Sequence, residues 1–181
     1  LPWQLAQVRK GGMTLAAEVG TDRLRRAIRK TITNEDLLAG VRAAYAAGWK
    51  SVKVYFMAGF PGETDADLEG IVELCRAMSW ARKDVDGHKG AVTASVSWLV
   101  PKPHTPLQWA AQADMDYFWH ARTFLLERTR KSPVTVKCHH IERSVLEAVI
   151  ARGDRRLGRV VEAAWRAGAR FDGWREHFDF D

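Results

Sequence analysis

Cysteine is scarce in this chain of 181 residues, which contains only Cys75 and Cys138. The two are far apart and form no Cys-x-x-Cys pair, so the cysteines of this chain cannot build a metal or iron–sulfur site by themselves. Two distant cysteines also provide no disulfide framework. We therefore expect two inert thiols in a cytoplasmic protein, and no metal ligands among the candidate site residues.

Long hydrophobic runs are absent as well. No apolar stretch approaches the roughly 18 residues that a membrane helix needs. The first ten residues lack the basic start and apolar block of a secretory signal. A hydrophobic content of 46% and a charged content of 28% are ordinary for a soluble globular protein, and the length suffices for one real core. The composition thus predicts a globular protein with no membrane partner.

Acidic residues are fewer than basic ones, 22 against 28, which gives a net charge of +6. Two segments are crowded with basic side chains, residues 23–30 and residues 152–159, but neither contains the interleaved aromatic residues of a single-strand binder. Two interpretations stay open. One is an ordinary basic protein, and the other is an α/β module that binds RNA or another polyanion through these clusters.

Four short apolar segments favour β-strands, and helical spacing fills the intervals between them. The predicted strands are residues 13–17, 52–58, 92–100 and 134–138. Helices are predicted to start at Thr21, Thr33, Thr64 and Asp114, and two more cover residues 144–150 and 160–166. Asp36 follows Thr33 by three residues, as in a capping box. Residues 83–90 are polar and are predicted as a loop.

The alternation of strands and helices predicts an α/β fold with a mainly parallel sheet of about four strands. The strands are almost continuously apolar, which is typical of a sheet covered on both faces. Four strands are too few to close a barrel, so the sheet is open or part of a larger one. Polar residues interrupt the strands at Thr14, Lys53, Tyr55 and Ser97. They would line a substrate cavity if they point into a barrel, or reach the rim if they point outward.

Two predicted strands break into turns that no helix could continue, at residues 59–64 and 101–106. Ligands of α/β proteins bind at the carboxyl ends of the strands, so these loops and the end of the first strand are where we expect a site. Gly59 and Gly62 permit backbone conformations that other residues resist, and Pro61 stiffens the loop. The amides of the helix that follows would point at a ligand, or Glu63 would simply stabilise the helix start.

Glu18, at the end of the first strand, suits a hydrogen bond to a ribose hydroxyl or an amino group; the alternative is an ion pair with Arg23 or Lys53. Three further candidates, Lys102, His104 and Thr105, lie in a stiff loop between three prolines, which is either an ordinary turn or a pocket border.

Three motifs follow one another on successive strand ends: Glu-Val-Gly-Thr-Asp-Arg-Leu at residues 18–24, Gly-Phe-Pro-Gly-Glu-Thr at 59–64 and Pro-Lys-Pro-His-Thr-Pro at 101–106. Their order resembles the second half of a radical S-adenosylmethionine (SAM) domain, a partial (β/α)6 TIM-like barrel. The nearest branch includes methylthiotransferases and cobalamin-dependent "Fe-S oxidoreductase" proteins. The resemblance implies SAM contacts by residues of these motifs and by Tyr55 of the strand before the second motif: Glu18, Gly20, Tyr55, Gly59, Pro61, Gly62, Glu63, Lys102, His104 and Thr105.

The family's Cys-x-x-x-Cys-x-x-Cys loop, which holds a [4Fe-4S] cluster, is missing, and the sequence opens on Leu1 without an initiator Met. The resemblance therefore implies the C-terminal part of a larger iron–sulfur enzyme, inactive alone and without bound cofactor, although the full-length protein would use SAM and the cluster. Residues 1–140 would be the half-barrel and residues 141–181 a helical extension packed on it. The N-terminal half would be the partner, and an exposed sheet edge favours homo-oligomers.

Overall fold

The computed structural model describes residues 12–171 and 173–180, which form two compact units. Unit 1 consists of residues 12–99 and 113–139, and unit 2 consists of residues 100–112 and 140 onward. The two units are described separately.

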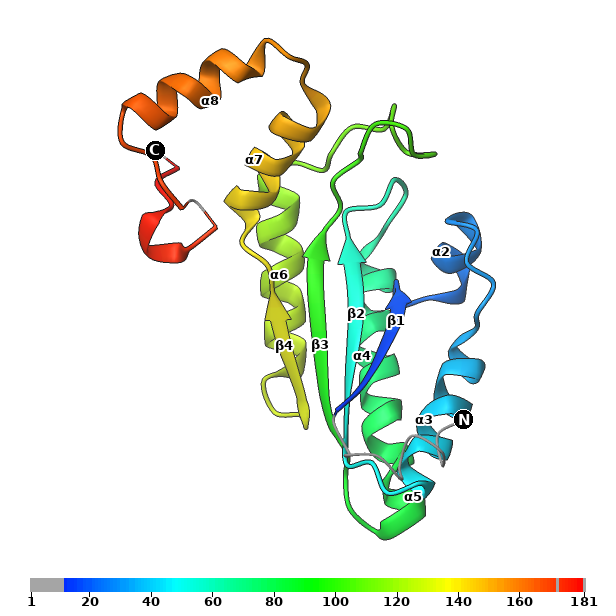
Figure 1. Ribbon diagram of the computed structural model, residues 1–181. Helices are drawn as coiled ribbons and strands as arrows, with labels where there is room; N and C mark the ends of the chain where they lie inside the picture. The colour runs from blue at the N-terminus through cyan, green and yellow to red at the C-terminus, as the bar shows by residue number, and fades with distance from the viewer. Residues whose placement is uncertain (1–11, 172, 181) are drawn as a thin grey trace. The chain divides into compact units, whose positions relative to one another are not determined.

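Unit 1 is a four-stranded parallel sheet with helices between the strands (Figure 1). Its strands are β1 (Met13–Glu18), β2 (Ser51–Ala58), β3 (Ala91–Trp98) and β4 (Val134–Cys138). Its helices are α2 (Asp22–Ala27), α3 (Asn34–Ala46), α4 (Asp65–Ala81), α5 (Lys83–Asp86) and α6 (Met115–Thr129). The strands lie side by side in chain order and every pair is parallel. This order is that of a (β/α) barrel, so the predicted partial barrel is confirmed.

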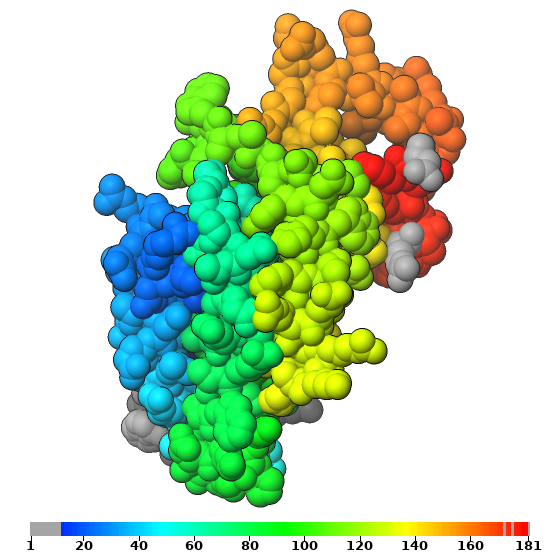
Figure 2. All heavy atoms as spheres, turned by 180° about the vertical axis from the view of Figure 1, so that it is seen from behind, coloured from blue at the N-terminus to red at the C-terminus, as the bar shows by residue number. Residues whose placement is uncertain are grey.

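Helices α3, α4 and α6 cover one face of the sheet, and Figure 2 shows their side chains next to one another over that face. The core lies between them. It is built from alternate strand residues such as Val54 and Phe56, and from helix residues such as Ile71 and Phe118, all at most 1% exposed.

The opposite face of the sheet carries no helix of unit 1 among the described residues (Figure 1). Most strand residues that point to it alternate with the core residues and stay partly or fully exposed, as in Lys53, Tyr55, Thr135 and Lys137, whereas Ser95 of β3 is buried. The prediction that both faces are covered is therefore wrong for unit 1 as described. The apolar runs look continuous because most side chains of the open face are small or uncharged, and Lys53 and Lys137 are the exceptions in β2 and β4.

The predicted helix starts are confirmed, because the hydrogen bonds that define them are local. Thr33 and Asp36 form the expected capping box of α3, Thr21 accepts from the Leu24 amide, and Asp114 accepts from the Tyr117 amide at 2.8 Å. One predicted loop is wrong: residues 83–86 form the helical turn α5, which ends at Gly87 with a φ of +79°.

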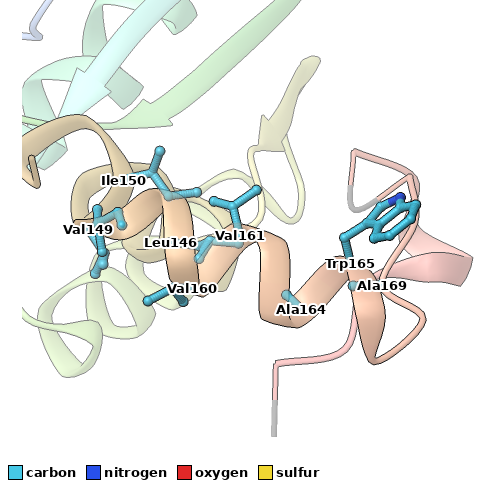
Figure 3. A pocket seen from close by; sticks show the side chains of 9 residues that line it. Leu146, Val149, Ile150, Val160, Val161, Ala164, Trp165 and Ala169 are labelled. Carbon is cyan, nitrogen blue, oxygen red and sulfur yellow. The ribbon is translucent and has the colours of Figure 1, made fainter. Parts of the chain in front are cut away.

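Unit 2 contains α7 (Ile141–Arg152), α8 (Leu157–Arg166) and the short 3-10 turn η1 (Arg175–His177). Both helices extend beyond the predicted ranges, as helix ends commonly do. A cavity of about 280 Å³ lies between α7 and α8 and is lined only by apolar residues, among them Ile150, Val161 and Trp165 (Figure 3). Among the described residues, no helix is both long enough and apolar enough to span a membrane.

Candidate functional site

The carboxyl ends of β1 and β2 lie at the same edge of the sheet, and β1 ends irregularly. Its register with β2 shifts between Ala16 and Glu18, and Glu18 has a φ of +66°, in the left-handed region that residues with a Cβ avoid. Such a conformation costs on the order of 1–3 kcal/mol and persists only where its surroundings hold it. The Glu18 carboxylate pairs with Lys30 at 2.8 Å, so neither Arg23 nor Lys53 is its partner.

Arg25 is the residue that holds this bulge. Its side chain is fully buried and donates to the carbonyl oxygens of Ala17 at 3.1 Å and Val19 at 2.8 Å. It also donates to Asp22 at 2.5 Å and to Asn34 at 2.7 Å. Burial lowers the pKa of the Arg25 guanidinium, and the Asp22 carboxylate opposes that shift. A buried arginine with four acceptors therefore fixes the backbone on both sides of Glu18, at Ala17 and Val19.

Gly20 brings the loop after β1 against helix α4. A Cβ at Gly20 would lie 2.2 Å from the Ile71 nitrogen and 2.5 Å from the Asp67 carbonyl oxygen, both of them backbone atoms. Gly70 faces it, since a Cβ there would lie 3.1 Å from the Gly20 carbonyl carbon. Glycine is therefore required here for close packing. The SAM contact implied for Gly20 stays a prediction.

Asp67 joins the two strand-end loops. It is 2% exposed and accepts hydrogen bonds from Thr21 at 2.5 Å and from the Thr64 amide and hydroxyl, each at 2.9 Å. It also forms an ion pair with Arg23, which in turn donates to the Gly62 carbonyl oxygen at 3.1 Å. Burial alone would raise the pKa of Asp67, but these hydrogen bonds outweigh it and hold the pKa below its usual range.

The loop from Gly59 to Thr64 is held by Glu63. The Glu63 Oε2 atom accepts from the Gly59 amide at 2.5 Å and from the Tyr117 hydroxyl at 2.6 Å. Burial raises the pKa of Glu63, and the bonds from Tyr117 and Gly59 oppose that shift. Gly59 has a φ of +101° and Gly62 a φ of +76°, so glycine is needed at both turns of this loop.

The two amides that directly precede α4 are used within the chain. The Glu63 amide donates to the Phe60 carbonyl oxygen at 3.0 Å and the Thr64 amide donates to Asp67. The helix start is thus capped by Thr64 and Asp67, whereas the Glu63 carboxylate holds the loop before it, and the SAM contact implied for Glu63 stays a prediction. Pro61 and Gly62 are exposed at the outside of the loop, and a Cβ at Gly62 would meet no atom within 4 Å. The open side of the loop is thus the part left for a ligand.

The candidates in the loop of residues 101–106 belong to unit 2. Lys102 pairs with Glu147 of α7 at 2.6 Å, and the Thr105 hydroxyl donates to the Lys102 carbonyl oxygen at 2.6 Å. His104 is exposed and has a φ of +60°. These bonds account for the stiffness of the loop, and the roles implied for Lys102, His104 and Thr105 stay predictions.

The residues present fit SAM but do not fit an iron–sulfur cluster. SAM offers ribose hydroxyls and an amino group, which can donate to the Glu18 carboxylate or to the carbonyl oxygen of the exposed Gly62, which also accepts from Arg23. A [4Fe-4S] cluster needs cysteine thiolates. Cys75 is fully buried, and burial raises its pKa to about 12 and that of Cys138 to about 11. The part of the chain that the structure describes contains no group of three or more possible metal ligands.

The first basic cluster is largely engaged inside unit 1. Arg25 is buried, Arg23 pairs with Asp67 and Lys30 pairs with Glu18, whereas Arg26 and Arg29 are exposed. In unit 2, Arg152 donates to the Ala110 carbonyl oxygen and Arg156 pairs with Asp154. Most of these charges therefore serve internal contacts, and polyanion binding stays a prediction.

The sequence alone did not single out Arg25, Asp67 or Tyr117. Tyr117 and Glu63 lie 54 residues apart, and Asp67 and Thr21 lie 46 apart, so no local spacing connects them. Lys137 was overlooked for a different reason. It alternates with Val136 and Cys138 in the same way as Lys53 alternates with its neighbours, and this period of two could have placed it on the open face.

A model of the Radical SAM superfamily matches residues 4–75. The matched range contains β1, β2, both loops described above and part of α4. Among curated proteins, an uncharacterized protein of Methanocaldococcus jannaschii is 29% identical over 151 residues. That similarity covers 83% of this chain but only 32% of the relative, so the chain spans about a third of the length of the curated relative that it matches. The chain is thus similar to radical SAM proteins over the two strands that form the candidate site.

Proposed function

We propose that this chain is part of a radical SAM enzyme, in which the ends of β1 and β2 contact SAM. The observation that carries the proposal is the match to the Radical SAM superfamily over residues 4–75, because this range includes both strand-end loops. The parallel sheet in chain order supports it. The position of the candidate residues supports it too, because Glu18 and the open side of the Gly59–Glu63 loop lie at the same end of the neighbouring strands β1 and β2.

The residues proposed to meet SAM are Glu18, for a ribose hydroxyl or the amino group, and the backbone from Gly59 to Gly62. Arg25 fixes the end of β1, Asp67 joins the two loops, and Glu63 fixes the loop that follows β2. When bound beside a reduced iron–sulfur cluster, SAM supplies the radical chemistry of this class. The proposal also holds that this chain is the C-terminal half of a methylthiotransferase-like or cobalamin-dependent enzyme in the cytoplasm. The cluster is then assigned to a segment outside these residues.

The N-terminal half of the same enzyme is the proposed partner. In the described sheet β1 is an edge strand. An edge presents unpaired backbone groups that another strand can extend. We propose that a strand of the preceding half pairs with β1 and continues the barrel. The reading frame before Leu1 is then expected to encode three closely spaced cysteines in the pattern Cys-x-x-x-Cys-x-x-Cys, and a preceding sequence without them would contradict this assignment.

Titration of SAM into the ¹⁵N-labelled chain tests the binding site directly. We expect weak binding, since half a site is present, with amide shifts confined to Glu18 and residues 59–63. The variant Glu18→Gln removes the carboxylate that is proposed to accept from SAM. A hydrogen bond to a charged group contributes about 1.5–3 kcal/mol, so the affinity should fall roughly tenfold or more.

The matched control is Glu35→Gln, which removes the same charge from an exposed position at the start of α3. Its SAM affinity is expected to equal that of the unchanged chain. The proposal fails if millimolar SAM shifts none of the strand-end amides. It fails equally if the two glutamine variants weaken binding to the same extent.

A further inference from the structure

Two neighbouring rows on the open face of the sheet in unit 1 consist of hydrogen-bond donors, apart from Ala16 of β1, which pairs with Tyr55. The register of the strands aligns Tyr55, Ser95 and Lys137 in one row across β2, β3 and β4. The neighbouring row contains Thr14, Lys53, Thr93 and Thr135. Every one of these side chains offers an N–H or O–H donor, and two of them carry a positive charge.

No acidic side chain belongs to these two rows. The acidic residue nearest to them along β1 is Glu18, at the end of the strand, and Lys30 neutralises it at 2.8 Å. Within residues 12–171 and 173–180, neither Lys53 nor Lys137 forms an ion pair with an aspartate or glutamate. The face therefore presents two uncompensated ammonium groups among hydroxyl donors.

The contact between Lys53 and Tyr55 determines which hydrogen bond the Tyr55 hydroxyl can still form. Lys53 Nζ donates to the Tyr55 hydroxyl oxygen at 2.9 Å and lies 4.5 Å from the centre of the Tyr55 ring. Because the Tyr55 oxygen accepts this bond, its own hydrogen is left to be donated to another acceptor. Tyr55 is 41% exposed, so that acceptor can come from outside the chain.

The spacing allows both lysines to reach one ligand. Lys53 and Lys137 are two strands and two residues apart in register, which corresponds to about 12 Å between their Cα atoms at about 4.8 Å per strand and 3.3 Å per residue. Two extended lysine side chains can converge over β3, the strand between theirs, on which Ser95 is 7% exposed. An oxyanion accepts hydrogen bonds from ammonium and hydroxyl groups together.

We infer that the open face of the sheet binds the oxyanion of a small-molecule substrate, a phosphate or carboxylate group, through Lys53, Lys137 and Tyr55. The inference rests on the proposed function for the identification of the bound molecule as a substrate. The oxyanion site itself follows from the charge and the donors of the face.

The test is a titration of inorganic phosphate into the ¹⁵N-labelled full chain, with the ionic strength held constant by chloride. Saturable amide shifts are expected at Tyr55, Ser95 and Lys137. The double variant Lys53→Gln and Lys137→Gln should weaken this binding at least tenfold. The matched control is the double variant Lys50→Gln and Lys131→Gln, which removes two exposed lysines that precede the same strands, β2 and β4, and should leave phosphate affinity unchanged.

Equal weakening by both double variants would show general charge attraction and overturn the inference. Shifts confined to Arg26 and Arg29, or to the arginines of unit 2, would also overturn it. SAM added to the same samples separates the two proposals. Phosphate binding at Tyr55 without SAM shifts at residues 59–63 supports the oxyanion site and refutes the proposed function, and SAM shifts without phosphate binding do the reverse.

Discussion

Replacing Gly20 with alanine tests whether the candidate site depends on close packing between the β1 loop and α4. The new Cβ would lie 2.2 Å from the Ile71 nitrogen, 2.5 Å from the Asp67 carbonyl oxygen and 2.5 Å from the Gly70 carbonyl carbon. All three are backbone atoms of one helix, so no side-chain rotation can relieve the overlap. Either the loop or the helix must move, and the hydrogen bond from Thr21 to Asp67 would be disturbed.

Overpacking of a well-packed site costs typically about 1–3 kcal/mol. Because the overlap involves only backbone, we expect the upper end of this range, about 3 kcal/mol. For a chain of this size each kcal/mol corresponds to roughly 2–4 °C in melting temperature. Gly20→Ala should therefore lower the melting temperature of unit 1 by roughly 6–12 °C.

Native-state hydrogen exchange at the amides of β2 and β3 is the appropriate assay, because it reports the stability of unit 1 separately from unit 2. The control is Gly40→Ala within α3, where a Cβ would meet no atom within 4 Å. Alanine favours a helix over glycine by about 0.5–1 kcal/mol, so this variant should gain stability. If Gly20→Ala changes the free energy of unfolding by less than about 0.5 kcal/mol, the packing role assigned to Gly20 is wrong.

Two further variants test the contacts that hold the loops. Burial raises the pKa of Glu63 in the folded state, so the folded chain binds a proton more tightly than the unfolded chain. Its contribution to stability is therefore full below the unfolded value of about 4.3 and is lost as the pH rises through the higher folded pKa. Glu63→Gln should remove this loss of stability at higher pH. Thermal unfolding of the variant and of the unchanged chain at constant ionic strength, between about pH 4 and 7, measures the difference in stability between them. A difference that does not vary with pH would contradict the assignment. Arg25→Lys keeps the charge but loses the planar group that serves Ala17, Val19 and Asn34, so we expect a loss of about 3 kcal/mol in urea unfolding. A loss below about 1 kcal/mol would mean that a single ammonium group can hold the bulge.

Local signals in the sequence were sufficient for the four strands and for most helices, but not for the turn α5, which was predicted as a loop. The capping residues Thr33 and Asp36 form hydrogen bonds over three positions, and the apolar periods of two and 3.6 identify strands and helices. Pro61 and the glycines on either side of it likewise mark where β2 must give way to a loop. The class of the fold and the rim that holds the candidate site could therefore be predicted.

The sequence by itself determined the four strands, the existence of the longer helices and the strand ends at which the loops lie, because hydrogen bonds and side-chain periods within an element span only a few positions. The tertiary structure alone decided that Lys30 neutralises Glu18, that Tyr117 holds Glu63 and that Gly20 must be small. It also decided that Lys53 and Lys137 share an open face. These contacts join elements that are distant in the chain, and their formation depends on how the helices pack against the sheet rather than on any local pattern.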